Sequence, residues 1–207
     1  LPGDGKDDPA RLLDVSWKGR PVTGIRQSWR RVYVYPVLTP AGVAVTEGRP
    51  SSDHPFHQSI TVGNDYVFTY RRSDAGRVED PGMCFYTDME DMRGRGEGRI
   101  IATTHNECTE LARDHLEIIV RTQWQGPEEG YAPKFRRVVA EESRTISVHP
   151  GERANVIDVR SQLRPTNWDL RIGPSRHGYF TVRVADHLRV VDPAGAPAGG
   201  RLVDAEG

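Results

Sequence analysis

The chain has 207 residues, of which 36% are hydrophobic, so it can bury a core and suits one large domain or two small ones. Its 28 lysine and arginine residues balance 29 aspartate and glutamate residues, so no overall field attracts nucleic acid or an acidic membrane surface. No stretch approaches the roughly 20 apolar residues of a membrane helix and no signal peptide is visible. We therefore expect a soluble protein, with the cytoplasm favoured and the compartment otherwise open.

Short runs of β-branched and aromatic residues, separated by Gly, Pro, Asn and Asp, recur along the chain, whereas helical periodicity is nearly absent. The pattern predicts strands at residues 12–17, 32–37, 66–70, 100–104, 116–124, 136–140, 144–148, 155–163, 168–172 and 179–184. Alternation is clearest at residues 32–35, where two valines face one side and two tyrosines the other. The spacing predicts an all-β, antiparallel β-sandwich, and residues 1–207 are interpreted as a single domain.

Two long stretches lack a strand pattern. Residues 38–58 are rich in Pro and Gly, and we interpret them as a functional loop. Residues 73–98 are predicted to hold a short helix near Asp88 to Met92. The run Arg93-Gly94-Arg95-Gly96 in this second stretch is interpreted as a mobile tip rather than a nucleic-acid-binding arm.

The densest cluster of chemically active residues is Asp53-His54-Pro55-Phe56-His57, at the end of the first loop. Imidazole titrates near neutrality, so a histidine pair beside a carboxylate can pass protons to and from a substrate. Under this interpretation His54 and His57 are the catalytic acid and base, and Asp53 orients one imidazole. The alternative that these side chains only anchor the loop by hydrogen bonds stays open.

The same two histidines could instead ligate a divalent metal ion. Two ligands in a loop are a weak metal signal, because a transition-metal site needs three or four ligands with orienting partners. His105 and His177 are candidates for the third ligand, and the alternative site that we retain consists of His54, His57 and His105. We expect no cofactor under the acid–base interpretation and a divalent metal ion under this one.

Four further residues are predicted to bind substrate. Tyr35 lies one strand upstream of the histidine loop, and Trp168 lies at the start of a predicted strand. Aromatic faces near carboxylates and imidazoles are typical of sugar or polyol sites, although aromatic residues in a sandwich more often belong to the core. His177 and Arg183 are the other two candidates, since a guanidinium can bind a carboxylate or phosphate through two parallel hydrogen bonds.

The segment at residues 31–46, followed by residues 53–57, resembles the bacterial family catalogued as "methane oxygenase PmoA". Further matching segments are Gln123-Trp124 before a Pro-Glu-Glu-Gly turn, residues 142–145 and residues 176–185, so the resemblance spans about residues 21–188. The name does not make this chain a membrane protein, because no segment could span a bilayer. The resemblance implies a soluble β-sandwich of unsettled activity, similar in design to the supersandwiches of sugar mutarotases, which use histidines and a carboxylate as acid and base.

The chain departs from this family in two respects. Members have a further histidine where this chain has Phe56 and a glycine where it has Ser59, so a family proton relay or metal site would be altered here. Members also continue into further strands past the position of Gly207. The resemblance therefore predicts a sandwich that lacks C-terminal strands, completed by a companion polypeptide or another segment. A homo-oligomer is also left open.

The sequence predicts a lyase, isomerase or hydrolase that uses histidine acid–base chemistry on a sugar, polyol or related oxygenated metabolite, by epimerisation, elimination or hydrolysis. One alternative is a metal-dependent enzyme, and another is a non-catalytic carbohydrate-binding or assembly module. The expected partner is a small polar metabolite, and neither nucleic acid nor a membrane is expected to bind.

Overall fold

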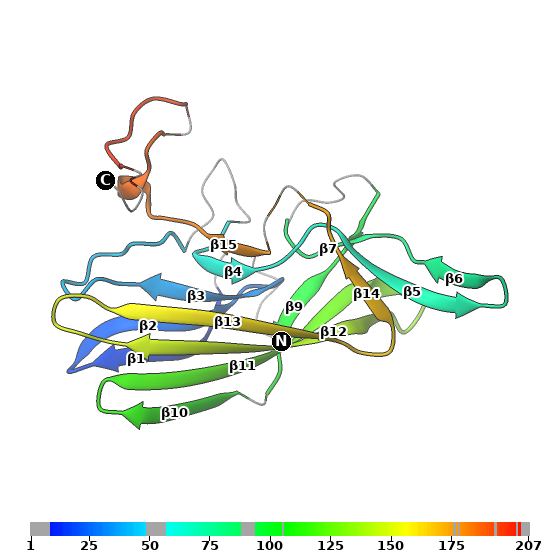
Figure 1. Cartoon of the computed structure of the whole chain (residues 1–207), viewed down its shortest axis with the longest axis horizontal. Coiled ribbons are helices and arrows are strands. Elements are labelled where there is room, and N and C mark those ends of the chain that lie inside the picture. The colour runs from blue at the N-terminus through cyan, green and yellow to red at the C-terminus, as the bar shows by residue number, and fades with distance from the viewer. Residues whose placement is uncertain are drawn as a thin grey trace.

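The structure is a computed structural model that describes residues 9–48, 57–87, 94–104, 106–175, 177, 179–192, 194–201 and 203. Fifteen strands and one short 3₁₀ helix, η1 (Asp186–Leu188), account for the regular structure of these residues (Figure 1). Within the described part of the chain, no helix is long and apolar enough to cross a membrane.

The strands form three sheets. The first contains, in spatial order, β1 (Ala10–Trp17), β2 (Arg20–Gln27), β3 (Val32–Val37), β4 (Ile60–Val62) and β15 (Phe180–Val182). The second contains β10 (Glu107–Ala112), β11 (His115–Glu129), β12 (Phe135–His149) and β13 (Val156–Pro165), with β9 (Arg99–Ala102) also paired to β11. The third contains β14 (Asp169–Ile172), β5 (Val67–Ser73), β7 (Met83–Cys84) and β8 (Gly96–Glu97), with β6 (Gly76–Glu79) paired to β5.

The first and second sheets pack face to face and enclose one hydrophobic core. Val15, Ile25 and Val34 from the first sheet meet Ile118 and Ile146 from the second. On β11 and β12 the buried residues alternate with more exposed ones, so a period of two in the sequence predicts their buried face. On β2 and β3 consecutive residues are buried, including Tyr33 at 0% exposure. The predicted all-β sandwich with antiparallel strands is therefore confirmed, although β7 and β8 form a parallel pair.

A second hydrophobic core lies between the second and third sheets. Trp124 and Ile100 from the second sheet pack with Val67 and Met83 from the third, and the ring of Phe85 lies 4.8 Å from that of Trp124. Strands β11 and β12 are each 15 residues long, so each contributes to both cores. Figure 1 shows the third sheet at one end of the molecule, beyond the sandwich of the first two.

Several details differ from the sequence prediction. Residues 136–140 and 144–148, predicted as two strands, are one continuous strand, β12. Strand β2 was not predicted, because Pro21 and Gly24 interrupt its apolar pattern. The stretch at residues 73–98 contains three short strands, and Arg95 is buried rather than part of a mobile tip. The helix expected near Asp88 to Met92 lies outside the described residues.

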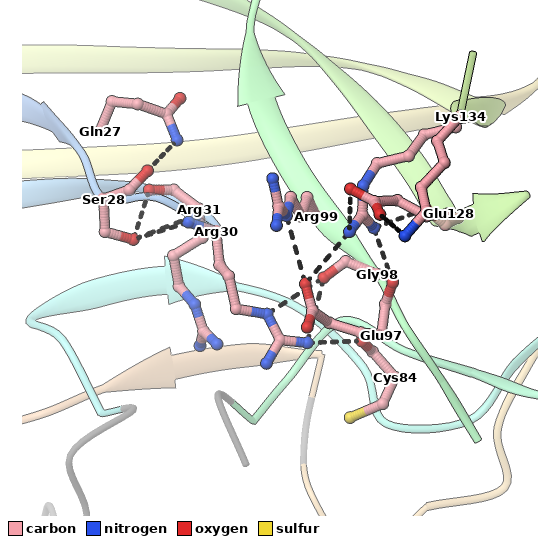
Figure 2. A network of polar contacts seen from close by, with 12 residues as sticks. Gln27, Ser28, Arg30, Arg31, Cys84, Glu97, Gly98, Arg99, Glu128 and Lys134 are labelled. Atoms are coloured by element: carbon pink, nitrogen blue, oxygen red, sulfur yellow. Dashed lines mark hydrogen bonds and ion pairs between the residues drawn. The ribbon is translucent and has the colours of Figure 1, made fainter. Parts of the chain in front are cut away.

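A buried arginine ties the turn between β2 and β3 to the third sheet. The guanidinium of Arg30 donates hydrogen bonds to the carbonyl of Gly98 at 3.2 Å and to that of Cys84 at 3.3 Å (Figure 2). The turn is held by Ser28, whose hydroxyl accepts a hydrogen bond from the backbone N–H of Arg31 at 3.1 Å. The same turn therefore fixes Arg31 at the entrance to β3, close to the site described next.

Candidate functional site

The site begins with a histidine that is held by a carboxylate. Nδ1 of His177 lies 2.9 Å from Oδ2 of Asp65, and the backbone N–H of His177 donates to the hydroxyl of Ser175 at 2.9 Å. The Ser175 hydroxyl in turn donates to the other carboxylate oxygen of Asp65. Two separate contacts therefore fix the loop that carries His177 to one aspartate, although the two residues are 112 positions apart.

Arg95 completes the surroundings of Asp65. One guanidinium nitrogen lies 3.3 Å from Oδ2 of Asp65 and also donates to its backbone carbonyl, and the guanidinium stacks 4.2 Å above the ring of Tyr66. Burial by itself would raise the pKa of Asp65, but hydrogen bonds from Ser175, His177 and Arg95 outweigh it and hold the pKa below its ordinary value. Asp65 is therefore ionised at neutral pH.

Tyr86 links this pair to a second histidine. Its ring stacks on the imidazole of His177, with centroids 4.5 Å apart and an interplanar angle of 15°. Its hydroxyl lies 2.6 Å from Nε2 of His57, whose ring meets it edge-on. Burial raises the pKa of Tyr86, and the field of Asp65 adds to this while that of Arg31 opposes it. The phenol therefore stays protonated at neutral pH, and a neutral His57 can accept its proton in a hydrogen bond.

The elements that position these residues converge at one end of the third sheet. Asp65 lies in the loop that enters β5, and Ser175 and His177 follow β14, the neighbour of β5. Tyr86 follows β7, and His57 precedes β4. Gly63 permits a close crossing of two of these loops, since a Cβ atom there would lie 2.4 Å from the carbonyl oxygen of Phe85.

This arrangement suits proton transfer. Because Asp65 is ionised, it accepts a hydrogen bond from Nδ1–H of His177, and the neutral imidazole then carries its lone pair on Nε2. The His177 side chain keeps 23% of its surface exposed, so the imidazole is partly open to solvent. Tyr86 and His57 lie next to it and form a second proton-bearing pair. A base and an acid are thus available within one cluster.

The structure brings together two of the residues predicted from the sequence, His57 and His177, through the ring of Tyr86. The remaining loop candidates, Asp53 and His54, and the metal candidate His105 lie outside the described residues. The set His54, His57 and His105 is therefore not seen as a whole. Among the residues that are described, no three His, Cys, Asp or Glu side chains are grouped as metal ligands.

The other predicted substrate-binding residues occupy different places. Tyr35 is half-buried, with its ring 6.4 Å from that of Tyr33 and packed so closely on Gly48 that a Cβ there would collide with it. The backbone N–H of Arg183 donates a hydrogen bond to the carbonyl of Ser59, two residues beyond His57. Trp168 lies in a separate cleft at the far end of β5 and β14. Of these residues, Arg183 is the one that the backbone connects to the His57 segment.

Sequence reasoning missed Asp65, Tyr86 and Arg95. Asp65 follows the Gly63-Asn64 pair, which marks a turn, and turn chemistry explains a lone aspartate without any function. Tyr86 and Arg95 lie in the stretch with no strand pattern. The signal in the sequence was that each of these residues, charged or aromatic, lies beside a short apolar run. Such an arrangement is too common to identify a site.

Fold and site together define an all-β sandwich protein with a carboxylate-supported histidine, a stacked tyrosine and a second histidine. The chain belongs to DUF6807, a family of unknown function, whose family model matches residues 13–207. Comparison with curated proteins and comparison with solved structures each gave no match. The resemblance to the PmoA family and the likeness to sugar mutarotases stay predictions from the sequence.

Proposed function

We propose that the protein is an enzyme that moves protons on an oxygenated metabolite, with His177 as the base. The observation that carries the proposal is the Asp65–His177 pair and its link to a second histidine. The imidazole of His177 stacks on Tyr86, and the Tyr86 hydroxyl is hydrogen-bonded to His57. A carboxylate that fixes the Nδ1–H tautomer of a partly exposed imidazole is a recurrent way to present Nε2 as a general base.

In the proposed reaction, Nε2 of His177 takes a proton from a carbon of the substrate that lies next to a carbonyl or carboxyl group. Asp65 stabilises the imidazolium that forms, because its negative charge lies 2.9 Å from Nδ1. Tyr86 or His57 returns a proton to the substrate, either to the opposite face of the same carbon or to a leaving oxygen. The first outcome is an epimerisation and the second an elimination of water. In both, His177 then gives its extra proton to water and the acid regains one from water, which restores the starting protonation states.

The substrate class that we propose is a sugar, polyol or related metabolite. Members of this class that carry a carbonyl or carboxyl group offer the acidic C–H bond and the leaving hydroxyl group that this chemistry needs. The proposal revises the assignment made from sequence in one respect: His177, with Asp65, takes the role of base, and His57 acts with Tyr86. The metal-dependent alternative depends on His54 and His105, and nothing among the described residues favours it over the acid–base proposal.

The proposal is tested by proton exchange in heavy water. A panel of aldoses, sugar acids and polyols is incubated with the protein in D₂O, and proton NMR follows deuterium incorporation, epimerisation and loss of water. His177→Gln and Tyr86→Phe should each slow the reaction at least about 100-fold, within the usual size of acid–base contributions. The matched control is His187→Gln, which replaces an exposed histidine on η1.

Each variant is checked by circular dichroism and by its melting temperature, so that loss of activity is not loss of folding. Wild-type protein that leaves every compound of the panel unexchanged would contradict the proposal. So would a folded His177→Gln variant that works as fast as His187→Gln.

A further inference from the structure

A cleft lies at the other end of the β5–β14 pair, away from the Asp65–His177 site. It has a cavity volume of about 970 Å³, and its walls include Tyr70, Arg71, Arg72, Arg77, Trp168 and Asp169. This volume is near the upper end of the range for small-molecule sites, about 300–1,000 Å³. Val67 and Arg72 are five residues apart on β5, which corresponds to about 17 Å along a strand. The cleft is therefore distinct from the site at Asp65 and His177.

The pairing of the strands explains why a cleft forms here. Strand β14 pairs with β5 only from Ile172 to Asp169, which lies opposite Tyr70. Beyond this point Trp168 and its neighbour leave β5, while β6 continues alongside β5 as far as the pair Ser73 and Gly76. The cleft is the space between the diverging segment and the end of the β5–β6 hairpin, which Figure 1 shows projecting from the molecule.

The cleft is rich in arginine. Its walls carry three guanidinium groups and a single carboxylate, that of Asp169. Arg77 lies 3.1 Å from Asp169, but 56% and 75% of these two side chains are exposed, and exposed ion pairs of this kind are weak enough for a ligand to replace. Arg72 makes no ion pair with any described residue, so its guanidinium can bind the carboxylate of a ligand.

Two aromatic rings are held rigidly beside these arginines. The guanidinium of Arg77 lies 3.9 Å above the ring of Tyr70, and that of Arg137 lies 5.2 Å from the ring of Trp168. Arg137 is fixed by Glu129 at 2.6 Å and by Asp80 at 3.3 Å, so it supports Trp168 from inside the protein. Trp168 is half-buried and still contributes to the wall of the cleft.

We infer that this cleft binds a carboxylated saccharide, a short uronate. Planar guanidinium groups bind carboxylates through paired hydrogen bonds, which a simple point charge does not reproduce. The flat, apolar face of a sugar ring packs on an aromatic ring such as that of Trp168. Arg71 already pairs with Asp80 and Arg77 with Asp169, so a neutral saccharide would leave Arg72 without a charged partner. An inorganic anion would leave the aromatic wall uncovered. The inference does not depend on the proposed catalytic function.

Isothermal titration calorimetry tests the inference. Trimers of galacturonate, glucuronate and mannuronate are titrated into the full chain, with the neutral trimer of galactose, sodium acetate and sodium sulfate as reference ligands. At least one uronate trimer should bind at least tenfold more tightly than the neutral trimer, and raising the salt concentration should weaken it. Trp168→Ala and Arg72→Gln should each weaken that binding at least fivefold.

The matched control is Arg153→Gln, which removes an exposed arginine from the connection between β12 and β13 and should bind as the wild type does. The inference is overturned if none of the three uronates binds, or if the cleft variants bind as well as the control does. It is also overturned if acetate or sulfate binds as tightly as the uronate, because the aromatic wall would then play no part.

Discussion

At the residue scale, the interior feature that most needs compensating contacts is a fully buried ion pair in the second sheet. Glu142 and Arg144 are joined at 2.9 Å, with 0% and 1% of their side chains exposed. The carboxylate also accepts hydrogen bonds from Trp124 at 3.1 Å and from Ser161 at 2.7 Å. Burial would raise the pKa of Glu142, but Arg144 and these donors hold it below its ordinary value. The charge is thus fully supported by its neighbours.

Neutralising this carboxylate should be costly. Glu142→Gln leaves the guanidinium of Arg144 buried without a counter-charge, and removing one partner of a buried pair typically costs about 3–5 kcal/mol. The matched control is Glu141→Gln on the same strand, since Glu141 pairs with Arg164 at the surface and such pairs contribute about 0–1 kcal/mol. Urea unfolding measures both variants. Equal free energies of unfolding for the two variants would show that the buried pair does not stabilise the fold as its geometry indicates.

Asp65 makes stability depend on pH. Its pKa in the folded protein is lowered, despite burial, by Ser175, His177 and Arg95, so its contribution is fully present above the unfolded value and is lost as pH falls through the folded one. Asp65→Asn should therefore be less stable than the wild type at pH 7, and the difference should shrink below about pH 4. Urea melts between pH 7 and pH 3 check this. A difference that stays constant over that range would contradict it.

At the element scale, the row of side chains that crosses the first sheet tests how far the core extends. Val34, Ile60 and Val182 are cross-strand neighbours, and the first two belong to the core between the first and second sheets. Val34 is 1% exposed, whereas Val182, on the edge strand β15, is 50% exposed. Val34→Ala should lower the free energy of unfolding by about 2 kcal/mol, and Val182→Ala by less than about 1 kcal/mol. Equal losses in denaturant titrations would mean that β15 is as well packed as β3.

The strands with regular alternation could be predicted from sequence, and those without it could not. Strand β3 was predicted with its observed bounds from its alternating valine and tyrosine residues, although Val32, Tyr33 and Val34 are all buried and both faces are covered at this end of the strand. The short strand β7 offers only two residues, too few for a period to be recognised. The length of β12 was underestimated, because the charged residues Glu141 and Glu142 interrupt its apolar pattern between the two predicted strands.

The candidate site could be predicted only in part for a related reason. Histidine is rare enough and titrates close enough to neutrality for His57 and His177 to be selected from sequence. Their partners are ordinary residues whose importance comes from contacts over long sequence separations, such as that between Asp65 and His177. Arg95 looks like part of a loop tip in the sequence, and its burial is explained by contacts with Asp65 and Tyr66 that only the structure shows.

At the scale of the whole molecule, the two long strands β11 and β12 connect the two hydrophobic cores. Because β11 and β12 contribute to both hydrophobic cores, the third sheet is anchored to the sandwich of the first and second sheets. The third sheet then presents the Asp65–His177 site at one end of β5 and the arginine-rich cleft at the other. A strand pair between the two sites is a suitable scaffold for side chains that must keep their relative positions.

The central claim is that Asp65 holds His177 with its proton on Nδ1 and its lone pair on Nε2. Long-range ¹⁵N–¹H NMR of the histidine side chains, recorded at a pH where this imidazole is neutral, measures the tautomer directly. The account predicts the Nδ1–H tautomer in the wild type and a mixture of tautomers in Asp65→Asn. A wild-type His177 protonated on Nε2 would contradict the claim, and the proposed base would then be lost.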